Sequence, residues 1–216
     1  MARGKFITFE GGEGAGKSTQ VRLLAEALRG AGLDVLETRE PGGCESAEEI
    51  RRLLVEGRAE RWDPMTEALL HFAARREHLV RTVWPALEAG RWVVSDRFAD
   101  STLAYQGVGQ GLGRATFEKL YELTVGDFMP DLTLIFDLPV EVGLARAEAR
   151  AGVENRYESM GLEFHRKLRQ AFLEIAEAEP ARCAVIAADR PPEAVQEAVL
   201  ACVTARLEVA LPPPER

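Results

Sequence analysis

The residues best suited to chemistry near the start of the chain are a run of glycines that ends in a lysine and a serine. Residues 11–18 read Gly-Gly-Glu-Gly-Ala-Gly-Lys-Ser and fit G-x-x-x-x-G-K-[ST] at every fixed position. An apolar run at 6–9 precedes them, and a helical pattern begins near Lys17. Glycines let successive backbone N–H groups face one concavity, and the helix N-terminus adds positive potential. The segment therefore predicts binding of a nucleoside triphosphate.

The chain lacks a motif for guanine recognition, which disfavours a GTPase. A guanine-specific protein would need a motif such as N-K-x-D, but the single asparagine, Asn155, is followed by Arg156. Lys17 is expected to reach the β- and γ-phosphates, and the Ser18 hydroxyl is expected to ligate Mg²⁺. The predicted ATP-binding residues are Gly11, Gly12, Glu13, Gly14, Ala15, Gly16, Lys17, Ser18 and Thr19.

A second charged pair follows a short apolar strand at 92–95. Asp96 and Arg97 come directly after it. An arginine at the end of a strand is suited to bidentate contact with a phosphate. The Asp96 carboxylate is suited to Mg²⁺, either directly or through water.

Two pairs of side chains share one expected helix at the spacing of one turn. His71 and Arg75 lie at i,i+4, and Phe72 and Arg76 lie at i,i+4 on the adjacent face. A ring can stack on a base, and a guanidinium can bond its carbonyl edge. The same spacing also fits an ordinary amphipathic helix with Phe72 in the core and the arginines in solvent.

Three arginines precede or lie within a polar interruption at 151–159. These are Arg146, Arg150 and Arg156. A segment with several arginines can close over phosphates and supply positive charge to the transferring group. The alternative is a solvated charged loop.

The composition narrows the class of protein. There are 35 acidic against 27 basic residues and a net charge of −8, which argues against a nucleic-acid groove. The three cysteines have no C-x-x-C spacing, which disfavours a zinc site or a disulfide framework. This pattern predicts reduced thiols in a cytoplasmic protein. No run of 18 apolar residues and no signal-peptide pattern occurs, so no membrane association is expected.

Strand patterns alternate with helix patterns along the chain, which predicts an α/β fold with a five-stranded parallel sheet. Residues 1–210 are expected to form one domain, with a lid at about 146–158 and a frayed tail at 211–216. The expected strands are 5–9, 34–38, 92–95, 132–137 and 183–187. The expected helices are 17–28, one capped by Ser46 and Glu49, 64–87 with a kink at Pro85, 101–106, 116–125, 140–150, 161–177 and 192–207.

The motifs together resemble the bacterial thymidylate kinases, a family of P-loop nucleoside monophosphate kinases. The matching segments appear in the family's order. They are F-E-G-G-E-G-A-G-K-S-T from residue 9, T-R-E-P-G-G at 38–43, A-A-R-R-E-H-L at 73–79, S-D-R-F-A-D-S-T-L-A-Y-Q-G at 95–107, P-D-L-T at 130–133 and E-N-R-Y-E at 154–158.

The resemblance implies a reaction and a set of roles. ATP would phosphorylate dTMP to dTDP in a homodimeric enzyme, with Lys17, Arg97, Arg150, Arg156 and Glu13 as catalytic residues. Glu13 would face the acceptor sugar, Arg97 with Arg51 would hold the acceptor phosphate, and Tyr105 would favour deoxyribose. The implied dTMP-binding residues are Glu13, Glu40, Arg51, His71, Phe72, Arg75, Arg97, Thr102, Tyr105 and Gln106, with Ser18 and Asp96 at the metal.

Two positions depart from the family's commonest pattern. An aromatic residue usually precedes the base-binding arginine by four, but alignment puts His71 there, with Phe72 next to it. A register that pairs Phe72 with Arg76 stays open, although Arg75 keeps the 22-residue separation from Arg97 seen in bacterial members. Gly14 stands where some members carry a catalytic arginine, which implies that the lid supplies that charge.

Two alternatives share the triphosphate site but not the acceptor. One is a P-loop kinase that acts on another nucleoside monophosphate or on a deoxynucleoside. The other is a nucleotide-dependent switch or regulatory ATPase that needs no small-molecule acceptor.

Overall fold

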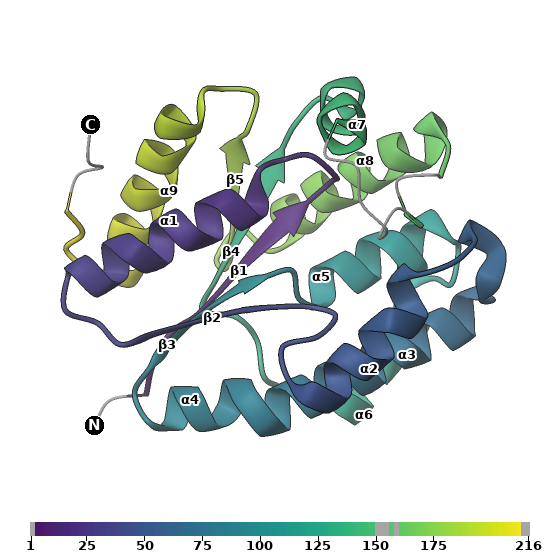
Figure 1. Ribbon diagram of the computed structural model, residues 1–216, viewed down its shortest axis with the longest axis horizontal. Helices are drawn as coiled ribbons and strands as arrows, with labels where there is room; N and C mark the ends of the chain where they lie inside the picture. Colours follow the sequence, from purple (N-terminus) through teal and green to yellow (C-terminus); the bar gives the residue numbers. More distant parts are fainter. Residues whose placement is uncertain (1–2, 150–155, 158–159, 213–216) are drawn as a thin grey trace.

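The computed structural model describes residues 3–149, 156–157 and 160–212. Five parallel strands form one sheet in the order β2-β3-β1-β4-β5, with helices on both faces (Figure 1). This confirms the predicted α/β class. The strands are β1 (Phe6–Gly11), β2 (Val35–Arg39), β3 (Trp92–Asp96), β4 (Leu132–Asp137) and β5 (Cys183–Ala187).

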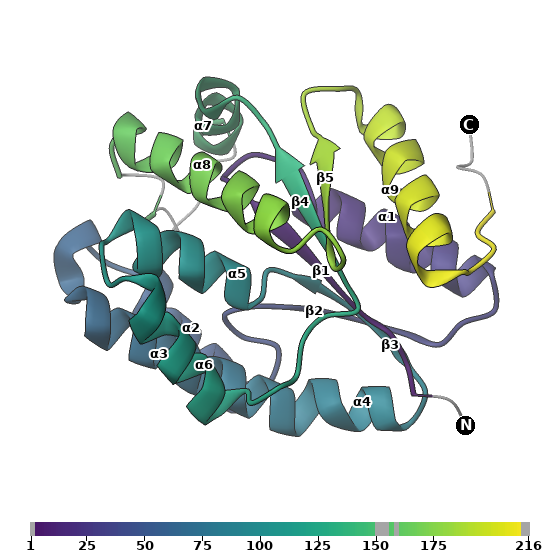
Figure 2. The same ribbon diagram turned by 180° about the vertical axis from the view of Figure 1, so that it is seen from behind.

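The helices form two layers, because adjacent residues of each strand point to opposite faces of the sheet. Figures 1 and 2 show α1 and α9 together over one face and α4, α5 and α8 on the other. Ile7 faces the first layer and Phe6 the second, and both are fully buried. The helices are α1 (Lys17–Gly30), α2 (Glu45–Val55), α3 (Pro64–His78), α4 (Trp84–Glu88), α5 (Ala99–Thr102), α6 (Arg114–Thr124), α7 (Val140–Glu148), α8 (Leu162–Ala178) and α9 (Pro192–Leu207).

The start of α3 follows the sequence signal. The Asp63 carboxylate accepts hydrogen bonds from the backbone N–H groups of Met65 and Thr66, at 3.0 and 3.2 Å, and Pro64 takes the first helical position. The helical run does not end at Pro85 but continues to Glu88. A π-helical segment, Leu79–Val83, joins α3 to α4, and its wider turn accommodates the N–H that proline lacks.

Two other local predictions are wrong because tertiary contacts override them. The Ser46 hydroxyl caps nothing and instead donates to Glu77 of α3 at 3.0 Å. The helix expected at 101–106 extends further, since α5 continues as a π-helical segment, Leu103–Gly109. A Cβ at Gly109 would lie 2.7 Å from the ring of Phe164, so this glycine lets α8 approach closely.

Parallel pairing brings the predicted functional segments to one edge of the sheet. Phe9 of β1 and Arg39 of β2 both lie opposite Asp96 of β3. The glycine-rich loop, the turn after β2 and the turn after β3 therefore meet beyond the carboxyl ends of the strands, where ligands of such sheets bind. Within the described part of the chain, no helix has the length and apolar character needed to cross a bilayer.

Candidate active site

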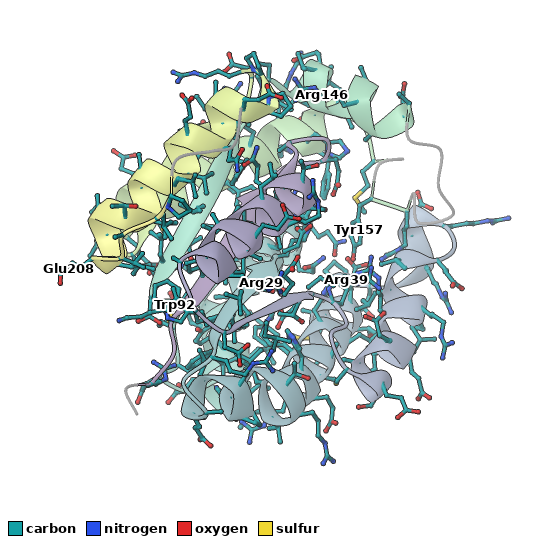
Figure 3. The ribbon with its side chains drawn as sticks, turned by 60° about the vertical axis from the view of Figure 1, so that its left-hand side comes forward. Arg29, Arg39, Trp92, Arg146, Tyr157 and Glu208 are labelled. Atoms are coloured by element: carbon teal, nitrogen blue, oxygen red, sulfur yellow. The ribbon has the colours of Figure 1, made fainter. Side chains whose placement is uncertain are left out.

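A cavity of about 410 Å³ opens at this edge of the sheet. Its volume suits a small ligand such as a mononucleotide. Figure 3 labels two of its lining residues, Arg39 and Tyr157. The lining also contains Glu13, Ser18, Glu40, Arg51, His71, Arg75, Asp96, Arg97, Phe98, Thr102, Tyr105, Gln106 and Ala147.

The glycine-rich loop leads from β1 into α1 with its lysine turned inward. Lys17 is 7% exposed, and its Nζ donates to the carbonyls of Gly11 and Gly12 at 3.1 and 2.7 Å. Burial and repulsion by Arg97 lower the pKa of Lys17 to about 8, against the attraction of nearby carboxylates. Among the described residues, the Lys17 ammonium donates only to these two neutral carbonyl oxygens, and phosphate oxygens could replace them.

α7 packs directly on this loop. Gly14 has a left-handed φ of 69°, and a Cβ there would lie 2.0 Å from the carbonyl oxygen of Gly143. A Cβ at Gly143 would in turn lie 2.4 Å from the carbonyl oxygen of Glu13. Two facing glycines thus allow the backbones of the loop and α7 to touch.

The two residues predicted to hold a metal are in contact with each other. The Ser18 hydroxyl donates to Asp96 Oδ2 at 2.5 Å, and both residues line the cavity. A hydroxyl and a carboxylate fit Mg²⁺, which usually keeps waters and takes further oxygens from bound phosphates. Among the described residues, no group of three or more His, Cys, Asp or Glu side chains is arranged to hold a metal.

Arg97 is held by its backbone in an unusual conformation. Its φ is 72°, in the left-handed region that non-glycine residues rarely adopt. The Arg97 N–H donates to the carbonyl of Phe9 at 2.9 Å, and the next N–H, of Phe98, donates to Glu10 Oε1 at 2.7 Å. Burial and the neighbouring Asp100 raise the pKa of Glu10 to about 8. Glu10, to which no role was assigned from the sequence, thus fixes this turn.

The Arg97 side chain meets two other predicted residues. Its Nη2 donates to Glu13 Oε1 at 2.8 Å, and the Tyr105 hydroxyl donates to the same oxygen at 2.7 Å. Burial would raise the pKa of Glu13, but Arg97 and Lys17 outweigh it and lower the pKa to about 2. The structure therefore brings Glu13, Arg97 and Tyr105 together where the loop meets the cavity.

Arg75 is a buried cation in the cavity lining. It is 2% exposed; its Nε donates to Glu40 Oε2 at 2.7 Å, and its Nη2 donates to Thr102 Oγ1 at 3.0 Å. The guanidinium also lies over the rings of Phe72 and Phe98, at 5.0 and 5.2 Å from their centroids. Its Nη1 is buried and has no hydrogen-bond partner among the described residues.

Of the two rings considered for the base, the structure places only His71 at the cavity. Burial and the positive charge of Arg75 lower the pKa of His71 to about 3, so the imidazole is neutral near pH 7. Phe72 is 1% exposed and packs against Phe117 with 5.6 Å between centroids. Phe72, which was expected to contact dTMP, therefore lies in the core and does not line the cavity, because one step along a helix turns its side chain away from that of His71.

Arg51, Thr102 and Gln106 also line the cavity. Arg51 Nη1 donates to the carbonyl of Pro41 at 2.7 Å, beside Glu40. Gln106 is 1% exposed, and its Nε2 donates to Glu67 Oε1 at 2.6 Å.

Neither of the two predicted lid arginines that the structure describes, Arg146 and Arg156, lines the cavity. Arg156 is 1% exposed, pairs with Glu67 and donates to the carbonyls of Arg58 and Leu54, at 2.9 and 3.0 Å. The structure thus places this predicted lid arginine in a buried network beside the cavity. Arg146 lies on α7, where its Nη1 donates to the carbonyl of Ala188 at 3.4 Å (Figure 3). Arg150 lies outside the described residues.

Sequence reasoning missed two buried residues on α3. Glu67 contacts Arg156, Tyr157 and Gln106, and His78 Nδ1 lies 3.0 Å from Glu40 Oε1. The sequence does contain a signal for these residues, because positions 67, 71, 75 and 78 have the i, i+4, i+8, i+11 spacing of one helix face. When polar side chains occupy one face of a helix in this way, they can form a shared buried hydrogen-bond network.

Comparison with known proteins gives one consistent family. A family model described as thymidylate kinase matches residues 9–199. A thymidylate kinase of Caulobacter vibrioides is 56% identical over 207 residues, which cover 96% of this chain and 99% of the relative. One of Dinoroseobacter shibae is 53% identical over 201 residues, with 93% and 97% covered. A crystal structure of thymidylate kinase from Ehrlichia chaffeensis superposes with a TM-score of 0.75 at 36% identity, with 93% and 99% covered.

The contact between the glycine-rich loop and α7 generates a stability prediction. Gly14→Ala should lower the free energy of unfolding of the nucleotide-free protein by at least about 2 kcal/mol, since the left-handed backbone alone costs about 1 kcal/mol and the new methyl group meets a carbonyl. Gly12→Ala is the matched control, because a Cβ there meets nothing within 4 Å. Its change should stay within about 0.5 kcal/mol in urea unfolding. Equal effects of the two substitutions would contradict the contact.

Proposed function

The chain belongs to the thymidylate kinase family and phosphorylates dTMP, and on this premise we propose that the γ-phosphoryl group of ATP passes to the dTMP phosphate in the cavity. The observation that carries the proposal is the contact of Glu13, Arg97 and Tyr105, where the triphosphate loop meets the acceptor cavity. Because the chain belongs to this family, neither alternative function is retained: it is not a kinase for another acceptor, and it is not a regulatory ATPase.

The phosphoryl transfer needs little acid–base catalysis from the enzyme. The acceptor is a phosphate oxygen that is already ionised near pH 7, so no strong general base is needed. Catalysis is alignment together with neutralisation of the charge on the transferring group. Lys17 exchanges its carbonyl partners for the β- and γ-phosphates, and Arg97 holds the acceptor phosphate in line with them.

Mg²⁺ fits the Ser18–Asp96 contact. When bound, it would neutralise charge on the β- and γ-phosphates. Ser18 would offer its hydroxyl oxygen directly, and Asp96 would hold the metal or one of its waters. The contact between the two side chains keeps both oxygens at the same point of the cavity.

The acceptor base is recognised at the opposite end of the cavity. Arg75 Nη1, a donor, and Gln106 Oε1, an acceptor, are buried and lack partners among the residues that the structure describes. Thymine presents a carbonyl beside a ring N–H, which complements that pair. The neutral ring of His71 supplies a flat surface for the base, and Tyr105 lies beside Glu13, toward the sugar.

The remaining catalytic charge is assigned to Arg150. Gly14 offers no side chain, and Arg156 is committed to Glu67. Ala147, near the end of α7, lines the cavity, which supports a contribution from the residues that follow it. In this proposal residues 1–210 form one kinase domain.

We also propose that the enzyme is a homodimer, that it acts in the cytoplasm and that it binds no nucleic acid. Three exposed leucines lie on α2, α3 and α6: Leu53, Leu69 and Leu123, at 40, 49 and 82% exposure. These helices pack beside one another (Figure 1). Burial of such side chains across a two-fold axis would stabilise a dimer. The net charge of −8 disfavours a nucleic-acid partner.

Removal of the loop lysine tests the donor site. Lys17→Met should lower kcat/KM for dTMP more than tenfold, which corresponds to about 1.4 kcal/mol of transition-state stabilisation. Lys167→Met is the control, because Lys167 pairs with Glu163 on the exposed side of α8. A coupled assay of ADP release measures both, and a loss in Lys17→Met below tenfold would contradict the assignment.

Neighbouring arginines of α3 test the base site. Arg75→Met should raise the KM for dTMP at least tenfold and change the KM for ATP less than twofold. Arg76→Met should change neither, because Arg76 is exposed and donates to the carbonyl of Thr124. Circular dichroism checks that the Arg75→Met protein still folds, since Glu40 loses its arginine partner. A larger effect at Arg76 would favour the register that pairs it with Phe72.

Light scattering tests the oligomeric state. At micromolar concentration the protein should have about twice the mass of the 23.8 kDa chain. Leu69→Glu should shift the mass toward the monomer, because it places a charge in the buried interface. A monomeric wild-type protein would remove the dimer from the proposal.

A further inference from the structure

Glu67 is a fully buried carboxylate on α3, outside the cavity lining, that joins the acceptor site to Arg156. Its Oε1 accepts from Gln106 Nε2 at 2.6 Å, from Gln110 Nε2 at 2.8 Å and from the Tyr157 hydroxyl at 2.9 Å. Its Oε2 accepts from Arg156, which supplies the compensating charge. A buried carboxylate with this many donors is a fixed acceptor.

This arrangement sets the orientation of the Gln106 amide. An ionised carboxylate only accepts hydrogen bonds, so the amino group of Gln106 must face Glu67. The opposite orientation would place two acceptor oxygens against each other in a buried site. The carbonyl oxygen, Gln106 Oε1, is therefore left for a ligand, and within the described parts of the chain it has no partner.

Arg75 presents the complementary group. Its Nη2 is fixed on Thr102 Oγ1 at 3.0 Å, and Gln106 follows Thr102 by four residues along the same helical run. Its Nη1 is buried and lacks a partner among the described residues. Two residues of the cavity lining therefore each keep one buried polar atom of fixed identity that is unused among the described residues: a donor on Arg75 and an acceptor on Gln106.

Pyrimidine bases differ in the pattern of donors and acceptors on this edge. Thymine has a carbonyl acceptor next to a ring N–H donor. Cytosine has an amino donor next to a ring nitrogen acceptor. Cytosine would therefore place a donor against the guanidinium and an acceptor against Gln106 Oε1, and a site with buried polar groups rejects such a ligand strongly.

We propose that Glu67 is a specificity-determining residue that excludes cytosine nucleotides without touching them. It acts by preventing the Gln106 amide from turning its amino group toward the base. The inference rests on the proposed function, because it uses the assignment of Arg75 and Gln106 to the base edge. Glu67 is thus a positioning residue for recognition of the acceptor.

The test is a change of base preference in Glu67→Gln. A glutamine at 67 can donate or accept, so the Gln106 amide can take either orientation. The ratio of kcat/KM for dTMP to that for dCMP should fall at least tenfold, while the KM for ATP should change less than twofold. This ratio does not depend on the fraction of active enzyme. Glu77→Gln, on the same helix and paired outside the cavity with Ser46 and Arg81, should leave the ratio within twofold of wild type.

A second variant covers the case in which Glu67→Gln fails to fold. The single change removes the Glu67 counter-charge of the buried Arg156 guanidinium, which is destabilising. Glu67→Gln combined with Arg156→Gln removes both charges of the pair. The same fall in the ratio is expected, and an unchanged ratio in either folded variant would overturn the proposal.

Gln106→Leu separates this inference from the proposed base site. On its own it should lower the dTMP-to-dCMP ratio, and adding Glu67→Gln to it should change the ratio no further, since Glu67 acts through Gln106. If Gln106→Leu lowers the ratio but Glu67→Gln does not, only the role of Glu67 is overturned. If Gln106→Leu also leaves the ratio unchanged, the base contact in the proposed function falls with it.

Discussion

The structure around the cavity depends on pairing each buried guanidinium with a glutamate. A site for an anionic nucleotide needs positive charge, but a buried arginine without a partner is costly. Here three carboxylates hold three guanidinium groups, and the pairs are Glu13–Arg97, Glu40–Arg75 and Glu67–Arg156. The first pair is the most exposed, at 17 and 19% of the side chains, and it lies where phosphates would enter. The other two pairs are buried, and they fix the positions of the side chains around them.

The parallel sheet brings these pairs together. β1 and β3 are neighbours, so the glycine-rich loop and the turn that carries Arg97 leave the same edge. One face of α3 contributes Glu67, His71 and Arg75, which lie above that edge. The phosphate end of the cavity is therefore built from strand ends, and the base end is built from helix faces. Alignment of donor and acceptor follows from the packing of α3 against the turn after β3.

Features that depend on neighbours in sequence could be predicted, and features that depend on distant partners could not. The strands, the glycine-rich loop and the cap of α3 at Asp63 follow local rules. The place of Arg156 does not, because its partner Glu67 lies 89 residues away. Periodicity assigned Phe72 and His71 to neighbouring faces, but only the packing of α6 on α3 decides which face is buried. The resemblance to a family supplied roles, and burial places two of the residues concerned, Phe72 and Arg156, outside the cavity lining.

Neutron diffraction from crystals of the protein with dTMP would decide how the base is held, because deuterium positions identify amide and guanidinium orientations that X-rays leave to inference. We expect that Gln106 Nε2 stays on Glu67, Gln106 Oε1 accepts the N–H of thymine, and Arg75 Nη1 donates to its carbonyl. A base whose edge meets Gln106 Nε2, or which lies away from Arg75, would contradict it.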